Sequence, residues 1–297
     1  MPPRTDLALE AHEEIQTLHP RLPGVETKEV HRTHVKITRV FIKDDLAASL
    51  LGKPPGKYVT LEVPRIRERD HDVAEEAARS LADELAELLP PEEEASFLVA
   101  GLGNWHATAD SLGPKVVSRL LVTRHLPEHV PADLRGGLRS VCALSPGVLG
   151  LTGIETMEIL EGVVERVKPR AVICVDALAA RQVSRILTTI QVADTGIQPG
   201  SGVGNYRRGL DRESLGVPVI AIGVPTVVHA SVIAREALAP AGHESLSPAL
   251  EIRFGDLMVT PKEIDLMIDE LADIVAAGLN AAFHPRLREK SHLLSPV

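Results

Sequence analysis

Four uninterrupted apolar runs in the second part of the chain constrain its fold more than any other feature. They read FLVAGL, SVCAL, AVICVD and VPVIAIGV, at residues 97–102, 140–144, 171–176 and 217–224. Helix-like stretches separate them, at 111–125, 153–167 and 177–187. A strand without polar alternation is buried on both faces, which is typical of a parallel sheet covered by helices. The sequence therefore predicts an α/β fold with three layers, α/β/α, around a mostly parallel central sheet.

The part of the chain before Ser96 has a different pattern. Residues 34–42 and 57–63 alternate and are rich in β-branched side chains, which predicts strands of an antiparallel layer. Residues 72–89 have the period of an acidic amphipathic helix. Residues 1–29 are polar and are broken by Pro20 and Pro23, so we expect a loosely ordered arm there.

We expect one domain rather than two independent ones. Residues 7–95 would form a small β-rich layer with its helix, packed on a core made by residues 96–297. A chain of 297 residues with 44% hydrophobic side chains is long enough for such a core.

Composition excludes several classes of function. A net charge of −9 argues against a general nucleic-acid binder, because such binding depends on neutralising phosphates. No apolar run reaches the roughly 18 residues of a membrane span. The first residues lack an apolar signal segment, so we expect a cytoplasmic protein. Cys142 and Cys174 lie in apolar runs, which indicates buried, reduced thiols.

Two carboxylates are the best candidates for chemistry. In a parallel α/β sheet, sites form in the crevice beyond the carboxyl ends of the strands. Asp176 ends an otherwise apolar run, and Asp110 precedes a helix-like stretch. Either residue alone could be a helix cap. Two close carboxylates cannot easily both ionise, so together they supply a general base for water and a general acid for a leaving amide.

Other interpretations of the loops stay open. Gly101-Leu102-Gly103-Asn104 resembles half of a dinucleotide fingerprint, but His106 stands where the third glycine belongs. A non-catalytic module that holds a phosphate or nucleotide is therefore one alternative. Asp110, Asp176 and His229 could instead hold a metal for a metal-dependent peptidase, although their spacing matches no local metal motif. The segment from Thr152 to Glu155 matches a capping box, which gives Glu155 a structural role.

Eight long strings of the chain point to one family. They are RTDLALE, GLGNWHATADSLGPKVV, LVTRHL, PGVLGLTGIET, VDALAAR, TTIQVADTGIQPGSGVGN, GVPVIAIGVPTVV and LMVTPKEID. In this order they closely resemble the germination proteases of spore-forming bacteria, from the N-terminus to the last helix. Such a resemblance implies a fold similar to that of hydrogenase-maturation proteases.

The resemblance also implies an activity. Germination proteases are homotetrameric endopeptidases that are made as zymogens. They degrade the small acid-soluble proteins that coat spore DNA, and they cut after an acidic and before an apolar residue. The resemblance implies catalytic roles for Asp110 and Asp176 by an aspartic-type mechanism. It implies no cofactor, no direct contact with nucleic acid or membrane, and a location in the spore core.

Further residues on these strings are candidates for support or substrate binding. They are Gly103, Asn104, Glu155, Arg181, Asp194, Gly200, Ser201, Gly202 and His229. His229 stands where the family usually has Asp. The region from about 230 to 256 is shorter than is usual in the family, and we expect this segment to contribute to subunit contacts or gating.

The N-terminus suggests self-processing. Asp6-Leu7-Ala8 reads acidic, apolar, Ala, like the cleavage sites in the substrates of the family. We therefore expect residues 1–6 to be a propeptide that is removed by cleavage between Asp6 and Leu7.

Overall fold

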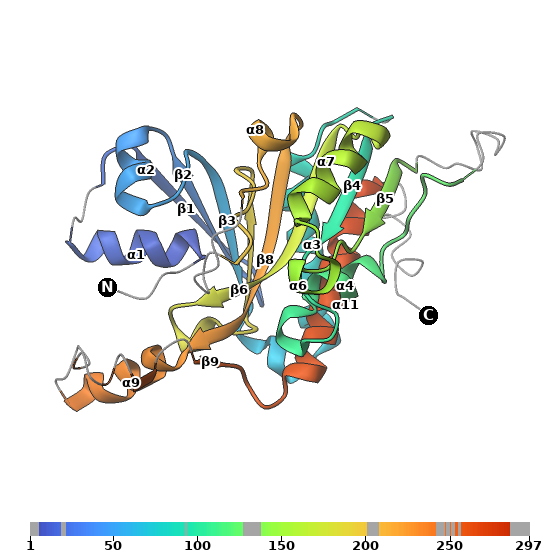
Figure 1. Cartoon of the computed structure of the whole chain (residues 1–297). Helices are drawn as coiled ribbons and strands as arrows, with labels where there is room; N and C mark the ends of the chain where they lie inside the picture. The colour runs from blue at the N-terminus through green and yellow to red at the C-terminus, as the bar shows by residue number, and fades with distance from the viewer. Residues whose placement is uncertain are drawn as a thin grey trace.

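The computed structural model describes residues 6–18, 22–92, 94–126, 138–200, 208–241, 247, 250, 253–254 and 257–285. A mixed sheet of nine strands runs through this part of the chain, in the order β1-β2-β3-β7-β8-β6-β4-β5, with β9 paired to β8 (Figure 1). The strands are β1 (Val25–His31), β2 (Lys36–Ile42), β3 (Gly56–Glu62), β4 (Ser96–Gly101), β5 (Ser140–Leu144), β6 (Ala171–Ala180), β7 (Thr189–Ala193), β8 (Val219–His229) and β9 (Met258–Val259).

The four apolar runs form the parallel half of the sheet, as predicted. β6 pairs in parallel with both β4 and β8, and β4 pairs in parallel with β5. β7 joins β8 in the antiparallel sense, and β3 joins β7 in the same way. The N-terminal strands therefore extend the central sheet instead of lying on it.

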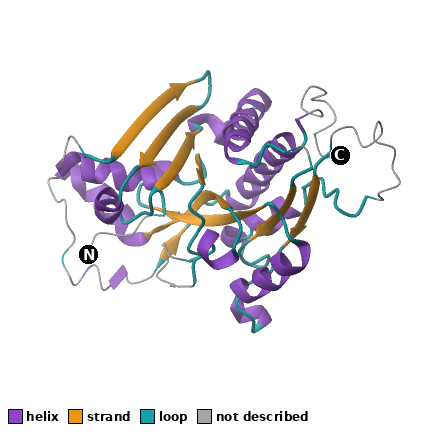
Figure 2. Cartoon of the chain, turned by 90° about the horizontal axis from the view of Figure 1, so that it is seen from above, coloured by secondary structure: helices purple, strands orange, loops and turns teal. Residues whose placement is uncertain are grey.

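Helices cover both faces of the sheet, which confirms the three-layer α/β/α fold (Figure 2). Alternate residues of each strand pack on opposite faces, so that Phe97 and Val99 contact one helical layer and Leu98 contacts the other. The first layer contains α3 (His71–Leu88), α4 (Leu112–Val117) and α11 (Ile264–Phe283). The second contains α1 (Ala8–Leu18), α2 (Asp45–Leu51), α7 (Thr156–Val167) and α8 (Arg212–Leu215).

Short elements and one peripheral helix complete the described fold. They are η1 (Pro64–Glu68), η2 (Thr108–Asp110), α6 (Leu149–Thr152), η3 (Val183–Arg185), α9 (Ala230–Leu238) and η5 (Ala239–Ala241). In the described part of the chain, no helix combines the length and hydropathy that a membrane span requires.

The prediction of a loose N-terminal arm is wrong for most of its length. α1 and β1 are regular elements, and residues 1–5 and 19–21 lie outside the described part. The acidic residues of α1 bind the body of the protein. The carboxylate of Glu10 is 2% exposed and accepts hydrogen bonds from the backbone N–H groups of Arg181 and Gln182, and Glu13 pairs with the buried Arg185 at 2.7 Å. Satisfied buried charges therefore order this segment.

The helix expected at 177–187 is also wrong. β6 continues to Ala180, and β8 continues to His229, so the two strands pair with each other beyond the end of β4. The Ala-rich sequence after Asp176 favours a helix locally, but strand pairing and burial of Ala179 and Ala180 decide otherwise.

The expected capping box does not form. Thr152 is the last residue of α6, and its Oγ1 accepts a hydrogen bond from the N–H of Ile154 at 3.1 Å. Glu155 is the N-cap residue of α7 and makes no side-chain cap bond. The final helix begins at Ile264, and Thr260 before it donates its hydroxyl hydrogen to the carbonyl oxygen of Thr226 at 2.8 Å.

Candidate active site

Asp176 lies in β6, one residue beyond the point where the neighbouring strand β4 ends. Gly101, the last residue of β4, pairs with Val175 of β6, so the next residue of β6 has no β4 partner. On its other side Asp176 pairs with Gly223 of β8. Asp176 is 6% exposed. The segment that follows β4 stays against β6 on the open side, where the N–H of Leu102 donates to the carbonyl oxygen of Val175 at 2.8 Å. Because β4 ends before β6 does, the space around Asp176 opens in the middle of β6 rather than at the end of that strand.

The segment that follows β4 carries Asp110. The N–H of Asn104 donates to the Asp110 carbonyl oxygen and to its Oδ2, both at 2.9 Å. Gly103 has a φ of +105°, which favours glycine, and a Cβ atom there would lie 2.1 Å from the Asp110 carbonyl oxygen. Thr226 of β8 donates its hydroxyl hydrogen to the carbonyl oxygen of Ala109 at 2.7 Å. These contacts fix Asp110 against β8.

Both aspartates line one cavity of about 240 Å³. Asp6, the residue before the expected propeptide cleavage, lines the same cavity. A cavity of this size holds several water molecules, since each occupies about 30 Å³. Two carboxylates around such a space can share one proton, so that one is ready to accept a proton from water and the other to donate one.

The structure brings some of the other candidate residues to this cavity and not others. Gly103 and Gly200 line it, and Asn104 holds Asp110 through its backbone N–H. Ser201 and Gly202 lie outside the described residues.

Four candidates lie outside the lining of the cavity. Arg181 pairs with Glu14 of α1, and Asp194 Oδ1 accepts a hydrogen bond from the N–H of Lys57 at 2.8 Å. Glu155 precedes α7, and His229 is the last residue of β8.

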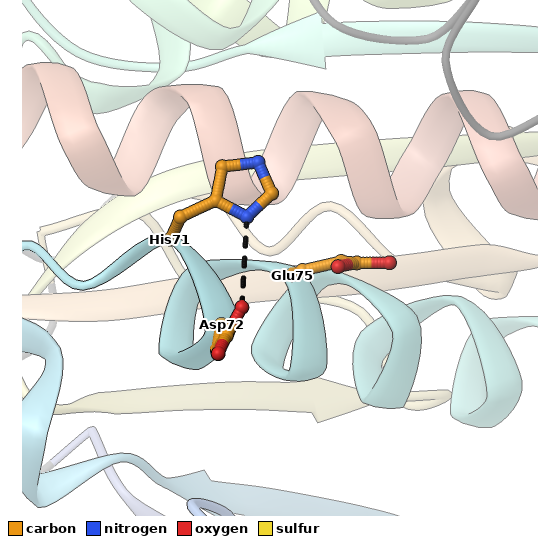
Figure 3. A group of neighbouring side chains, drawn as sticks. All are labelled: His71, Asp72 and Glu75. Carbon is orange, nitrogen blue, oxygen red and sulfur yellow. Dashed lines mark ion pairs between the residues drawn. The ribbon is translucent and has the colours of Figure 1, made fainter.

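The metal alternative gains no support from this arrangement. The structure describes Asp110, Asp176 and His229, and their donor atoms do not gather into a three-ligand group. Within the described residues, the one such group is His71, Asp72 and Glu75 (Figure 3). All three are exposed at the start of α3, where charged side chains are ordinarily solvated.

Several lining residues were not predicted. Gly147, Gln198 and Met258 line the cavity together with Thr226. Thr226 lies in the string GVPTVV, where it is the one hydroxyl among apolar residues. This isolated hydroxyl is the sequence feature that could have indicated a role for Thr226 at the site. Met258 reaches the cavity because β9 pairs with the end of β8, which no local pattern indicates.

Replacing Thr226 with Val tests how the loop of Asp110 is held. The change keeps the shape but leaves the Ala109 carbonyl without its hydroxyl donor, so we expect the free energy of unfolding to fall by about 1–2 kcal/mol. Thr60→Val is the matched control, because Thr60 is 1% exposed and its Oγ1 has no hydrogen-bond partner within the described structure. Urea denaturation measures both variants. Equal stability of the two would contradict the role of Thr226.

Comparison with known proteins decides the family. A family model described as germination protease matches residues 4–240 and 243–293. The chain belongs to the germination protease family. A germination protease from Caldanaerobacter subterraneus is 47% identical, with 97% of this chain and 96% of that protein covered. Those from Clostridium tetani and Bacillus mycoides are 41% and 40% identical, each over 96% of this chain and over 96% and 94% of their own lengths.

Membership in the germination protease family gives the protein a peptidase role in spore germination. Among solved structures, the NiFe hydrogenase maturation protease HycI from Thermococcus kodakarensis matches 66% of this chain and 98% of its own. It has a TM-score of 0.37 and 20% sequence identity.

Proposed function

We propose that this germination protease is an endopeptidase that starts the degradation of small acid-soluble, DNA-binding spore proteins. In this proposal Asp110 and Asp176 activate the water that attacks the peptide bond. The observation that carries it is the shared cavity, which both aspartates line together with Asp6, an acidic residue followed by an apolar one.

The chemistry needs no covalent intermediate. One carboxylate accepts a proton from water as the water oxygen attacks the carbonyl carbon, and the other donates a proton to the leaving nitrogen. Cys174 offers no rival nucleophile, because it is fully buried in β6 and burial raises the pKa of its thiol. The sequence also lacks a GxSxG nucleophile elbow.

The proposal includes a self-processing zymogen. Cleavage between Asp6 and Leu7 would release residues 1–6 and leave Leu7 as the new N-terminus. Two features of the residues at this bond support the cleavage. Asp6 lines the cavity of the aspartate pair, and the side chain of Leu7, the next residue, is fully buried. An acidic residue in the cavity followed by a buried apolar residue is the pattern proposed for substrates.

A purified small acid-soluble spore protein is the direct test of the substrate class. We expect the mature protein to cut it between an acidic and an apolar residue, and mass spectrometry of the fragments identifies the bond. An unrelated unfolded protein without such a junction is the control. An intact spore protein, or cuts at unrelated junctions, would overturn the proposed specificity.

The proposal also covers assembly and location. We propose a homotetramer in the spore core that uses no cofactor and contacts its substrates rather than DNA. The net charge of −9 supports the last point, because it disfavours binding to phosphates. Light scattering on the purified protein measures the assembly, and a monomeric mass would contradict it.

A further inference from the structure

We propose that Lys53 and Gln191 bind the carbonyl oxygen of Asp6 and stabilise the negative charge that forms on it during self-cleavage. This inference rests on the proposed function, because it takes Asp6–Leu7 as the bond that is cut. Neither residue belongs to the aspartate pair. Lys53 lies in the turn after α2 and Gln191 lies in β7, far apart in the sequence.

The contacts around the bond have the pattern of a carbonyl-binding site. Lys53 Nζ donates to the Asp6 carbonyl oxygen at 3.0 Å, and Gln191 Nε2 donates to the same oxygen at 3.1 Å. Gln191 Oε1 accepts a hydrogen bond from the N–H of Ala8 at 2.6 Å. A single side-chain amide thus binds the backbone on both sides of the Asp6–Leu7 bond.

Other contacts hold the bond in place. Asp6 Oδ2 accepts a hydrogen bond from the N–H of Ala179 at 3.1 Å, and the Leu7 side chain is fully buried. The side chain before the bond and the side chain after it therefore each have a binding site. With both ends held, the carbonyl oxygen stays directed at Lys53 and Gln191.

The strand register relates this carbonyl site to the aspartates. Gln191 of β7 pairs with Gly223 of β8, which pairs with Asp176 of β6. Their strand neighbours Val192, Ile222 and Val175 all pack into the core on the opposite face, so Gln191 and Asp176 project from the same face of the sheet. Two strand spacings, about 10 Å, separate their backbones.

Two adjoining cavities meet at Asp6. The first holds Asp110 and Asp176, and the second, of about 150 Å³, holds Lys53 and Gln191. Asp6 and Leu178 line both. The structure thus places the aspartates on one side of Asp6 and the donors to its carbonyl oxygen on the other.

Burial makes Lys53 a stronger donor than a surface lysine. Desolvation lowers the pKa of its ammonium group, and the nearby carboxylates of Asp6 and Glu10 oppose this effect. A charge in a region of low dielectric interacts more strongly with a developing oxyanion than a charge in water does. The backbone holds the residue in place, because its N–H donates to Ala48 at the end of α2 at 3.2 Å.

The reaction balances without a proton from either residue. Water adds its oxygen to the Asp6 carbonyl carbon, and one water proton passes to a carboxylate of the pair. The carbonyl oxygen becomes an oxyanion while it is hydrogen-bonded to Lys53 and Gln191. The C–N bond to Leu7 then breaks, the leaving nitrogen takes a proton from the pair, and Asp6 ends as a free carboxyl terminus.

Self-cleavage of the full chain tests the inference, with mass spectrometry following the loss of residues 1–6 over time. We expect Lys53→Met to slow the first-order rate by about 10²-fold, which is the usual effect of removing one oxyanion donor. Lys53→Arg keeps a charged donor and should recover much of the rate. Gln191→Glu keeps the acceptor for Ala8 but loses the neutral amide donor, so it should also be slow. Lys43→Met, at an exposed ion pair with Glu26, is the control.

The outcomes separate this inference from the proposed function. If the unchanged protein is never cut between Asp6 and Leu7, the proposed self-processing fails and the inference fails with it. If it is cut there, but folded Lys53→Met and Gln191→Glu proteins are cut as fast as Lys43→Met, the inference alone is overturned. Should Lys53→Met not fold, Gln191→Glu decides by the same criterion.

Discussion

Asp110→Asn and Asp176→Asn are each expected to reduce cleavage of a small acid-soluble spore protein by about 10³-fold or more. Asn has nearly the shape of Asp but can neither accept the proton of the attacking water nor donate one to the leaving nitrogen. The two residues line one cavity, and in the proposed mechanism they act on one water, so the double variant should be little slower than either single variant.

Initial rates of fragment formation measure this effect, and thermal denaturation verifies that the variants fold. Asp72→Asn is the matched control, because it removes an exposed carboxylate from the only three-ligand group among the described residues. We expect it to be fully active. Full activity of either Asp110→Asn or Asp176→Asn would remove that residue from the mechanism. A strong loss in Asp72→Asn would show that removing an exposed carboxylate far from the cavity is enough to lower the rate, and would contradict a specific role of the pair.

Gly103→Ala is expected to damage the site without touching a carboxylate. The new methyl group would lie 2.1 Å from the Asp110 carbonyl oxygen and 3.0 Å from its Oδ1, at a backbone φ of +105°. The loop must shift, which we expect to cost about 1–3 kcal/mol of unfolding free energy. A displacement of about 1 Å at a catalytic group can lower the rate about 10²-fold, so we expect a loss of that order.

Urea denaturation and the spore-protein assay measure the two effects of Gly103→Ala. Gly162→Ala in α7 is the control, since a Cβ atom there meets nothing within 4 Å. Ala replaces Gly favourably in a helix, so this control should keep its activity and its stability. If Gly103→Ala retains normal activity, the close approach of Gly103 to Asp110 is not what positions the Asp110 carboxylate.

The central sheet was predictable because burial on both faces leaves a strong signal in the sequence. The four apolar runs became the four parallel strands, and the helix expected at 72–89 is α3. The N-terminal arm was not predictable, because the charges of α1 are stabilised by Arg181 and Arg185, which are more than 160 residues away. Local patterns contain no information on such partners.

The site was predictable only in part, for a related reason. Asp176 ends an apolar run and Asp110 precedes a helix-like stretch, so both stand out in the sequence. Lys53 and Gln191 do not stand out: one follows a short helix and the other is a polar residue in a strand. The strand register places Gln191 in the row of Asp176, and the turn after α2 brings Lys53 to the Asp6 carbonyl oxygen.

The most direct test of the account is the kinetic order of self-cleavage in the full chain. The structure holds Asp6 of a chain in that chain's own cavity, together with Asp110 and Asp176. The account therefore predicts that Leu7 appears as the new N-terminus with a first-order rate constant that does not change when the protein is diluted. A different new N-terminus, or a rate that falls in proportion to dilution, would contradict it.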